Sequence, residues 1–257
     1  MNVRPAAVAG MFYPASTTAL KHLVTDLLNE PLPIEVPAVK ALIAPHAGYR
    51  YSGSVAASAY RLLAGKTFQR VLLLGPAHRV ALRGLAASNF DAFETPLGIV
   101  PIDRTLRDRS KKIPLIKIRD DAHEDEHSLE VQLPFLQTIL PDVTIFPLVV
   151  GQCSAEELAG AIEQLSDEQT LLLLSSDLSH YLPYDEAVEV DEHTIEKIEA
   201  AEQQMRGNEA CGAYPLNGFL RFAHQHHWQI HCVDYRNSGD TAGKRDHVVG
   251  YASFVVH

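Results

Sequence analysis

Short apolar runs alternate along the chain with longer segments in which apolar residues recur at helical spacing. The runs are typical of buried strands, and they cover residues 41–44, 71–75, 143–151, 170–176, 229–235 and 248–256. The segments between them predict helices over residues 17–28, 54–65, 128–140, 154–166, 185–205 and 210–225. This alternation indicates an α/β fold, and we expect a sandwich in which helices flank a central mixed, largely parallel β-sheet.

The chain shows no internal repeat and no low-complexity linker. The proline-rich stretch NEPLPIEVPAVK, residues 29–40, reads as a loop between the first helix and the sheet. With 257 residues, of which 46% are apolar, the chain is long enough for one large α/β domain, although length alone would also allow two. Because no boundary is visible, we predict a single domain over residues 1–257.

Charge and composition argue against several classes of protein. The formal net charge is -10 and Lys and Arg form no electropositive stripe, so nucleic acid is not an expected partner. No apolar run approaches the ~18 residues of a membrane-spanning helix, so a membrane is not expected either. Three widely spaced cysteines do not suggest a disulfide framework, and they favour the reducing cytoplasm as the location.

Three histidines lie within a few residues of the ends of three different predicted strands. They are His46, His78 and His180, and Asp177 shortly precedes the last of them in SSDLSHY. Ligands of open α/β sheets bind at the carboxyl ends of the strands, where loops from neighbouring strands converge. We therefore expect these side chains to share one site.

A metal ion is the natural ligand of such a group, because two histidines and one anionic residue suit zinc, copper, iron or nickel. The sequence leaves the third ligand open, since Asp177, Glu130, Cys153 and Cys211 all have suitable chemistry. Asp177 and His180 also suit an acid/base pair in which the carboxylate orients the imidazole ring.

A second candidate motif is HEDEH, residues 123–127, which matches the HExxH motif of zincin metalloproteases. That motif works only inside a helix, and here the helical apolar pattern begins at Leu129. The segment reads better as the acidic N-terminus of a helix, with His127 and Glu130 kept as candidate site residues. A zincin-type protease is therefore not favoured.

Other motifs give little support for further functions. The nucleotide-binding patterns GxGxxG and GxxxxGK[ST] are absent, and no GxSxG elbow surrounds Ser175 or Ser176. The glycine-rich SGDTAG, residues 238–243, is typical of a loop before the last strand, and its Asp240 is a further candidate pocket residue.

Several motifs together resemble one known family. In chain order they are RPAAVAGMFYP, APHAGYRYSG, LGPAH, EHSLEVQLPFL, SSDLSHY, ACG, and GDTAG followed by VVGYASF. This combination resembles the Memo family, which includes protein B of the AmmeMemoRadiSam system, and it runs from Arg4 to Val256. The family is similar in fold to class III extradiol ring-cleaving dioxygenases, which hold a non-haem iron at the end of a mixed sheet. The resemblance also assigns HEDEH to the EHSLEVQLPFL block and not to a zincin helix.

The resemblance implies a role for each matching residue. His46 in HAGY and His78 in GPAH match metal ligands, and Cys211 in ACG matches the third ligand, where the dioxygenases use a carboxylate. Asp177 and His180 match catalytic residues, with His180 in the place of the acid/base histidine. The implied metal is iron or copper, with zinc as a further option, because a thiolate is a soft ligand. The implied partners are a radical SAM protein and AmmeMemoRadiSam system protein A.

Two functional hypotheses follow. In the first, the protein is a non-haem iron- or copper-dependent oxidoreductase, with hydrolysis at a zinc ion as a weaker option. In the second, it is an adaptor that binds a peptide or an anion in the same cleft without catalysis, and Arg50 and Arg79 supply the positive charge. Both hypotheses involve an unidentified small-molecule or peptide ligand.

We also expect Gly48 and Gly53 to form a short loop after His46 that bends close to the metal. In that loop Tyr49 or Tyr51 would line the pocket.

Overall fold

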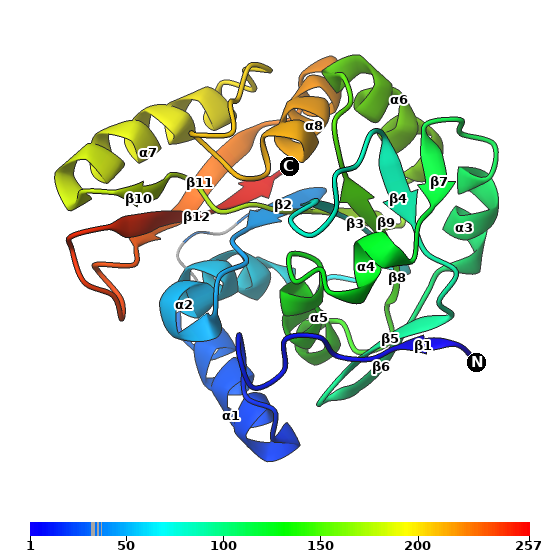
Figure 1. Ribbon diagram of the computed structural model, residues 1–257, viewed down its shortest axis with the longest axis horizontal. Helices are drawn as coiled ribbons and strands as arrows, with labels where there is room; N and C mark the ends of the chain where they lie inside the picture. The colour runs from blue at the N-terminus through cyan, green and yellow to red at the C-terminus, as the bar shows by residue number, and fades with distance from the viewer. Residues whose placement is uncertain (32–33, 35, 37) are drawn as a thin grey trace.

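A computed structural model describes residues 1–31, 34, 36 and 38–257 of the chain. Its centre is formed by four adjacent parallel strands (Figure 1), which lie in the order β2 (Ala41–Ala44), β9 (Thr170–Ser175), β3 (Arg70–Pro76) and β8 (Thr144–Val150). Every residue of β2, β3 and β9 is buried. These strands are apolar without alternation because helices cover both of their faces.

Antiparallel pairs extend the sheet on both sides. On one side β12 (Val248–Val256) pairs antiparallel with β2, and both β11 (Ile230–Asn237) and β10 (His180–Leu182) pair antiparallel with β12. On the other side β4 (Leu85–Ala87) pairs antiparallel with β8, and β7 (Ile116–Ile118) pairs parallel with β4. The predicted α/β fold with a central mixed, largely parallel sheet is therefore confirmed.

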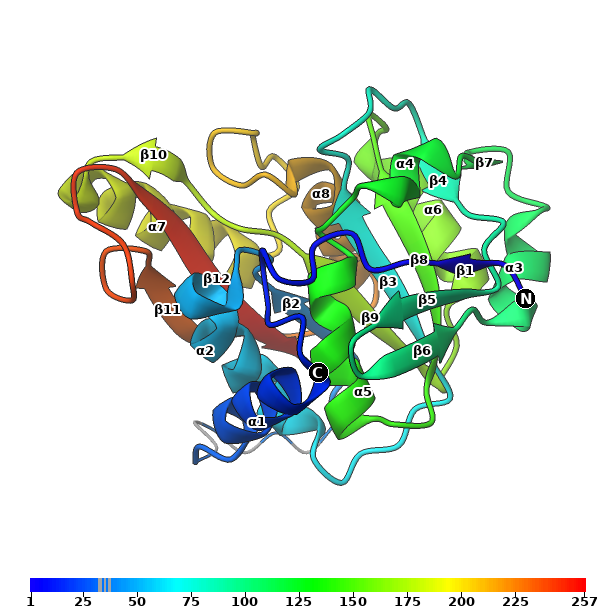
Figure 2. The ribbon, with the colours of Figure 1, turned by 60° about the horizontal axis from the view of Figure 1, so that its bottom comes forward.

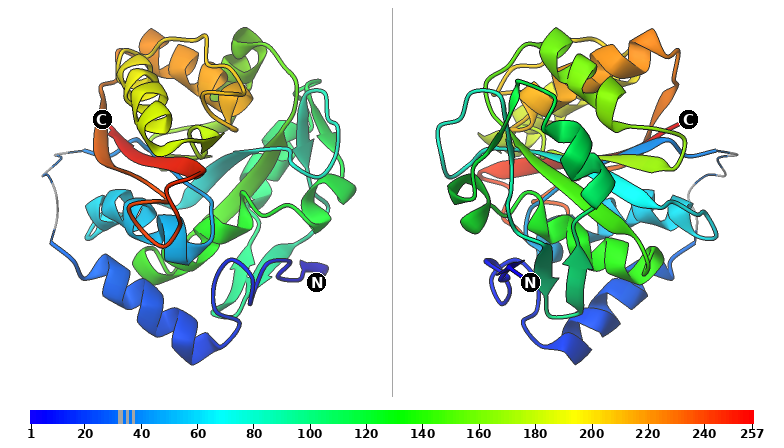
Figure 3. Two further views of the ribbon diagram at one scale, coloured as in Figure 1. Left: turned by 60° about the vertical axis from the view of Figure 1, so that its left-hand side comes forward. Right: turned by 90° about the vertical axis from the view of Figure 1, so that its right-hand side faces the viewer.

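Helices form a layer on each face of this sheet, as the edge-on view in Figure 3 shows. One layer contains α6 (Ala155–Leu165), α7 (Tyr184–Glu199) and α8 (Ala213–Gln225). The other contains α1 (Thr17–Leu28), α2 (Tyr49–Tyr60) and α5 (Leu133–Ile139), which come forward in Figure 2. A small sheet of β1 (Val3–Arg4), β5 (Ala92–Thr95) and β6 (Gly98–Pro101) lies beside α5. The remaining helices are short: η1 (Arg61–Leu63), α3 (Arg104–Ser110), α4 (Asp121–Glu124) and η2 (Glu130–Gln132).

Several local predictions need correction. The short strands β4 to β7 and helix α3 have no distinct apolar run and were not predicted. The predicted helix over 128–140 is divided into η2 and α5, and the helix predicted over 185–205 ends at Glu199. The loop predicted after His46 is wrong beyond Gly48, because that residue is the N-cap of α2 and Tyr49 already lies in the helix. The predicted loop over 29–40 includes residues 32, 33, 35 and 37, which lie outside the described residues.

Two further features of the structure concern membrane spans and cysteines. Within the described ranges, no helix is both long enough and apolar enough to cross a membrane. Cys153, Cys211 and Cys232 are all free thiols.

Candidate metal centre

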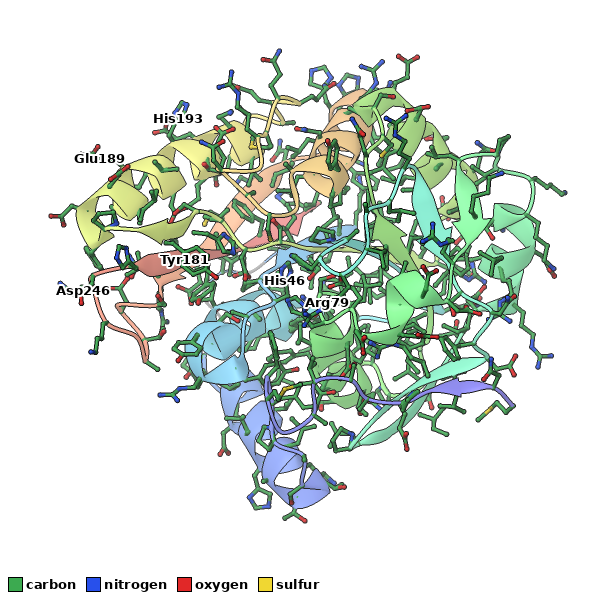
Figure 4. All side chains as sticks on the ribbon, in the orientation of Figure 1. His46, Arg79, Tyr181, Glu189, His193 and Asp246 are labelled. Carbon is green, nitrogen blue, oxygen red and sulfur yellow. The ribbon has the colours of Figure 1, made fainter. Side chains whose placement is uncertain are left out.

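The site lies at the carboxyl ends of three adjacent strands. Because β2, β9 and β3 run parallel, the residues that follow them meet at one edge of the sheet. His46 follows β2, Asp177 follows β9 and His78 follows β3. The rings of His46 and His78 are 5.1 Å apart between centroids, and Figure 4 labels His46 near the middle of the molecule.

His46 is buried and held at three points. Pro45 precedes it and lacks an N–H, which ends the ladder of β2. The backbone N–H of His46 donates to Oδ1 of Asp177 at 2.7 Å, and ring Nδ1 lies 2.9 Å from Oγ of Ser175. Ring Nε2 lies 3.3 Å from Sγ of Cys211. Burial lowers the pKa of His46 well below its ordinary value, so the ring is neutral at physiological pH.

His78 is oriented by a buried carboxylate. Its backbone N–H donates to Oε2 of Glu126 at 2.7 Å, and its Nδ1 lies 2.9 Å from Oε1 of the same residue. Burial acts to raise the pKa of Glu126, but hydrogen bonds and charge from His78, with the Ser128 N–H, outweigh it and hold that pKa at about 2. An ionised carboxylate behind an imidazole is the usual outer partner of a metal-binding histidine.

Cys211 reaches the site from a turn before α8, 165 positions from His46. The Cys211 N–H donates to the Asp177 carbonyl at 3.2 Å, and the Gly212 N–H donates to Oγ of Ser176 at 3.0 Å. A Cβ at Gly212 would lie 2.6 Å from that same oxygen, so only glycine allows this close approach. Burial, with a smaller contribution from Asp177, raises the pKa of the Cys211 thiol well above its usual value.

These three side chains fit one metal ion. A ligand atom from each of His46, His78 and Cys211 lies within 4.8 Å of the other two. Nitrogen and sulfur bound to one tetrahedral ion lie about 3.5 Å apart, given metal–ligand distances of ~2.0 and ~2.3 Å. The 3.3 Å between His46 Nε2 and Cys211 Sγ is close to that value. The donor set, two imidazoles and one thiol, suits a soft or borderline metal.

A second group of ligand atoms, from His78, Glu126 and His127, is equally compact. Both oxygens of Glu126 are already engaged, because they accept the two bonds from His78 and a third from the Ser128 N–H at 2.9 Å. Glu126 is therefore better explained as the partner that orients His78 than as a metal ligand.

His127 lies against the same group. Its ring centroid is 5.4 Å from that of His46 and 4.6 Å from that of His78, and Phe12 covers it at 4.7 Å. Its buried Nδ1 has no hydrogen-bond partner among the described residues. Burial lowers the pKa of His127, Glu126 acts to raise it, and the positive charge of Arg79 makes a smaller contribution in the same direction as burial. Arg79 Nε donates to the Asp125 carbonyl at 3.2 Å.

Among the described residues, Asp177 and His180 form hydrogen bonds to other partners, and they interact with each other through charge. Asp177 faces His46, with Oδ2 3.9 Å from Nε2 of that ring, and its burial raises the pKa of its carboxyl group. The His180 ring is oriented instead by the carbonyl of Leu178, which lies 2.8 Å from Nδ1. His180 begins β10, and the exposed Tyr181 follows it (Figure 4).

The other predicted pocket residues are less closely associated with the histidines. Tyr49 is buried and its hydroxyl donates to the Val131 carbonyl at 2.6 Å. Arg50 is exposed and stacks on Tyr51 at 5.0 Å. Asp240 lies in the loop between β11 and β12, where it accepts a hydrogen bond from the Tyr184 hydroxyl at 2.6 Å.

Glu130 belongs to neither candidate ligand group, because its buried carboxylate is engaged with the N-terminal segment. It pairs with Arg4 and accepts hydrogen bonds from Tyr13 and from the N–H groups of Ala7 and Val8.

Three residues around the ligands were not identified from the sequence. Glu126 holds His78, Ser175 contacts His46, and Gln132 donates to Ser175 at 2.9 Å. Two of them belong to the EHSLEVQLPFL block. From that block the sequence suggests only His127 and Glu130 as candidate site residues, because the block resembles the start of a helix.

The fold and the site define a class of protein, namely a mixed α/β protein with a His/His/Cys group at the carboxyl ends of its central strands. A family model described as Memo-like protein matches residues 4–255. The chain belongs to this family, which confirms the resemblance seen in its motifs.

Individual relatives agree with this assignment. A MEMO1 family protein of Aquifex aeolicus is 38% identical over 268 residues, covering 99% of each chain. A MEMO1 family protein of Sulfurisphaera tokodaii is 33% identical over 278 residues, covering 98% of each. Among solved structures, the uncharacterized protein JW3007 from Escherichia coli K12 aligns with a TM-score of 0.52 and 14% identity. That alignment covers 84% of this chain and 99% of the other, and it supports the fold alone.

Proposed function

We propose that this Memo-family chain binds one transition-metal ion through His46, His78 and Cys211 and acts as a metal-dependent redox enzyme. The observation that carries the proposal is the compact ligand group, with His46 Nε2 3.3 Å from Cys211 Sγ and all three ligand atoms within 4.8 Å. Burial shifts the pKa values of two of the three groups, His46 and Cys211, and ionisable groups perturbed in this way near strand ends are more often functional than structural.

Iron or copper is the proposed metal, and zinc is the further option. A thiolate ligand favours Cu(I), zinc or an electron-rich iron centre over the harder ions that carboxylates select. A bound iron or copper ion would supply one-electron chemistry together with open coordination positions for a small ligand. The likeness to class III extradiol dioxygenases supports a redox role, although Cys211 stands where those enzymes use a carboxylate.

We assign proton transfer to His180 and a positioning role to Asp177. The Leu178 carbonyl can only accept a hydrogen bond, so His180 donates from Nδ1 and keeps Nε2 free to exchange a proton with a ligand. Asp177 orients His46 through the backbone N–H and lies beside Cys211, whose N–H its carbonyl accepts. Its hydrogen bonds therefore position the proposed ligand residues, and its interaction with His180 is electrostatic.

The test is the metal content of protein purified without oxygen or chelator, measured by mass spectrometry and by anomalous scattering from crystals. We expect about one iron or copper ion per chain in the wild type, and a clear loss in His46→Ala because one of three protein ligands is gone. His193→Ala removes an exposed histidine on α7, whose side chain is 68% exposed, and should keep full metal content. Equal metal content in His46→Ala and wild type would contradict the site assignment.

A second candidate function is anion or peptide binding at the same place without catalysis. The observation that favours it is Arg79, an exposed cation near enough to His127 to lower the pKa of that ring. Titration of the chelator-treated protein with inorganic phosphate should then show binding that Arg79→Ala weakens about 10-fold, the loss of one charge-assisted hydrogen bond. Arg206→Ala, in the exposed loop after α7, is the control. Phosphate binding that is unchanged in Arg79→Ala would count against this function.

A further inference from the structure

The segment from Glu126 to Gln132 contacts His78 directly through Glu126 and reaches His46 through Ser175. We call it the bracket segment. Three of its polar side chains are almost completely buried, with Glu126 1% exposed and Ser128 and Gln132 both 0% exposed. Burial of a polar side chain is costly unless each donor and acceptor finds a partner. The partners found here determine which ring nitrogen of each histidine carries a proton.

Glu126, at the N-terminal end of the bracket segment, determines which ring nitrogen of His78 is protonated. The Glu126 carboxylate can only accept hydrogen bonds when ionised, so the His78 Nδ1 at 2.9 Å must be the protonated ring nitrogen. In a neutral imidazole this leaves Nε2 with its lone pair free. The Ser128 N–H donates to the same oxygen of Glu126 at 2.9 Å and holds the carboxylate in place.

Ser128 and Gln132 determine which ring nitrogen of His46 is protonated. They act through Ser175, which is also fully buried. The Ser175 hydroxyl lies 2.6 Å from the Ser128 carbonyl, an acceptor only, so its single proton points there. The Gln132 Nε2 donates to Ser175 Oγ at 2.9 Å. The remaining neighbour, His46 Nδ1 at 2.9 Å, must then also donate to Ser175. His46 is left with the lone pair on Nε2, which faces Cys211 Sγ.

The orientation of the Gln132 amide, on which this count depends, is set independently. Its Oε1 accepts a hydrogen bond from the Tyr60 hydroxyl at 2.7 Å, and its Nε2 lies 3.1 Å from the Pro45 carbonyl. The flipped amide would place an oxygen against a carbonyl oxygen and is therefore disfavoured.

We propose that the bracket segment is a positioning device that holds both histidines in the Nδ1–H tautomer, so that both present Nε2 to one metal ion beside Cys211. Glu126, Gln132 and Ser175 are the positioning residues. The part that concerns metal affinity rests on the proposed function, and the part that concerns tautomers does not. Backbone packing supports the device, because a Cβ at Gly75 in β3 would lie 2.7 Å from Ser128 Oγ.

The direct test is nitrogen NMR of the metal-free wild-type protein labelled at histidine. Long-range proton–nitrogen correlations distinguish a protonated ring nitrogen from one with a free lone pair. We expect His46 and His78 both to show a protonated Nδ1 and an unprotonated Nε2 at neutral pH. Assignment uses His46→Ala and His78→Ala, whose signals disappear. A protonated Nε2 on either ring would overturn the inference.

Matched serine variants test the effect on the metal. Ser175→Ala removes the acceptor of the His46 proton, and metal affinity should fall about 10- to 100-fold, the usual effect of losing an outer partner of a ligand. Ser110→Ala in α3 is the matched control, because it removes a buried serine hydroxyl that donates to a backbone carbonyl, that of Arg107 at 2.8 Å, outside the bracket segment. It should lower stability comparably and leave affinity and tautomers unchanged.

The outcomes separate this inference from the proposed function. Wild-type affinity in Ser175→Ala, or equal affinity losses in the two serine variants, would overturn the positioning role. A wild type that binds no metal, yet carries the His46 and His78 protons on Nδ1, would overturn the proposed function and support the positioning device. If Ser175→Ala does not fold, the wild-type NMR result alone decides the tautomer question.

Discussion

Replacing Cys211 with serine is expected to lower the affinity for Cu(I) or Zn(II) by more than about 100-fold, because a metal ligand contributes more than the outer partners whose loss costs ~10- to 100-fold. Serine keeps the size of the side chain and can accept the Asp177 N–H, which lies 3.3 Å from the sulfur. It does not supply an anionic sulfur to the metal. The fold should therefore persist while the soft ligand is lost, and competition with a chelator of known affinity measures the difference.

Cys211→Asp sharpens this test. Aspartate restores an anionic ligand, but its oxygen is harder than the cysteine sulfur. The metal preference of the site should therefore move from Cu(I) toward Fe(II) or Mn(II), even if the affinity for metal is lower overall. Cys153→Ser is the matched control, since Cys153 is a second partly buried free thiol that belongs to neither ligand group found among the described residues. Equal Cu(I) affinities in Cys211→Ser and Cys153→Ser would mean that Cys211 is not a ligand.

The two strand-end histidines could be predicted to share a site because the strands themselves are evident from the sequence. The runs before His46 and His78 are apolar at every position, which marks buried central strands, and parallel central strands bring their carboxyl ends together. The order of the strands was not predicted, and the expectation needs only that β2 and β3 lie near each other in the sheet. Any arrangement that makes β2 and β3 near neighbours places these two histidines at one edge.

Cys211 and the bracket segment could not be predicted in this way. Cys211 follows no strand, and it is held at the site by hydrogen bonds from the Cys211 N–H to the Asp177 carbonyl and from the Gly212 N–H to Oγ of Ser176. Only the family resemblance singled it out. Glu126 and Gln132 are polar residues, which sequence patterns assign to the surface, and only tertiary packing makes them buried. The same limit explains α2, where Tyr49 reads as a loop residue although it is a buried helical one.

The largest loss of stability is expected when the buried ion pair between Arg4 and Glu130 is broken. This pair connects the N-terminal segment to the bracket segment. Arg4 is fully buried and its side chain pairs with Glu130. It also donates to two backbone carbonyls, that of His123 at 2.7 Å and that of Glu126 at 2.8 Å. Its guanidinium lies 5.0 Å from the Phe93 ring. One side chain thus positions the backbone of Glu126, the residue that orients His78.

Arg4→Met is expected to lower the free energy of unfolding by about 3–5 kcal/mol, because it leaves the Glu130 carboxylate buried without a cation. Arg4→Lys should cost less than Arg4→Met, since it keeps a charge, but a lysine cannot reproduce the planar fork that serves three acceptors. Urea unfolding at neutral pH measures both variants. A chelator must be present, so that metal bound to the folded state does not contribute to the apparent stability.

Lys111→Met is the control, because it also removes an ion pair, but one that is exposed to solvent. Lys111 and Asp108 are 65% and 72% exposed, and a pair of this kind contributes about 0–1 kcal/mol. An Arg4→Met protein within about 1 kcal/mol of the wild type would mean that Glu130 is neutralised or solvated in another way. If the ion pair acts as inferred, folded Arg4→Met should also bind metal more weakly than Lys111→Met, because the carbonyl of Glu126 loses its donor. The carboxylate of the same residue is what orients His78, so stability and metal affinity are expected to fall together in this variant.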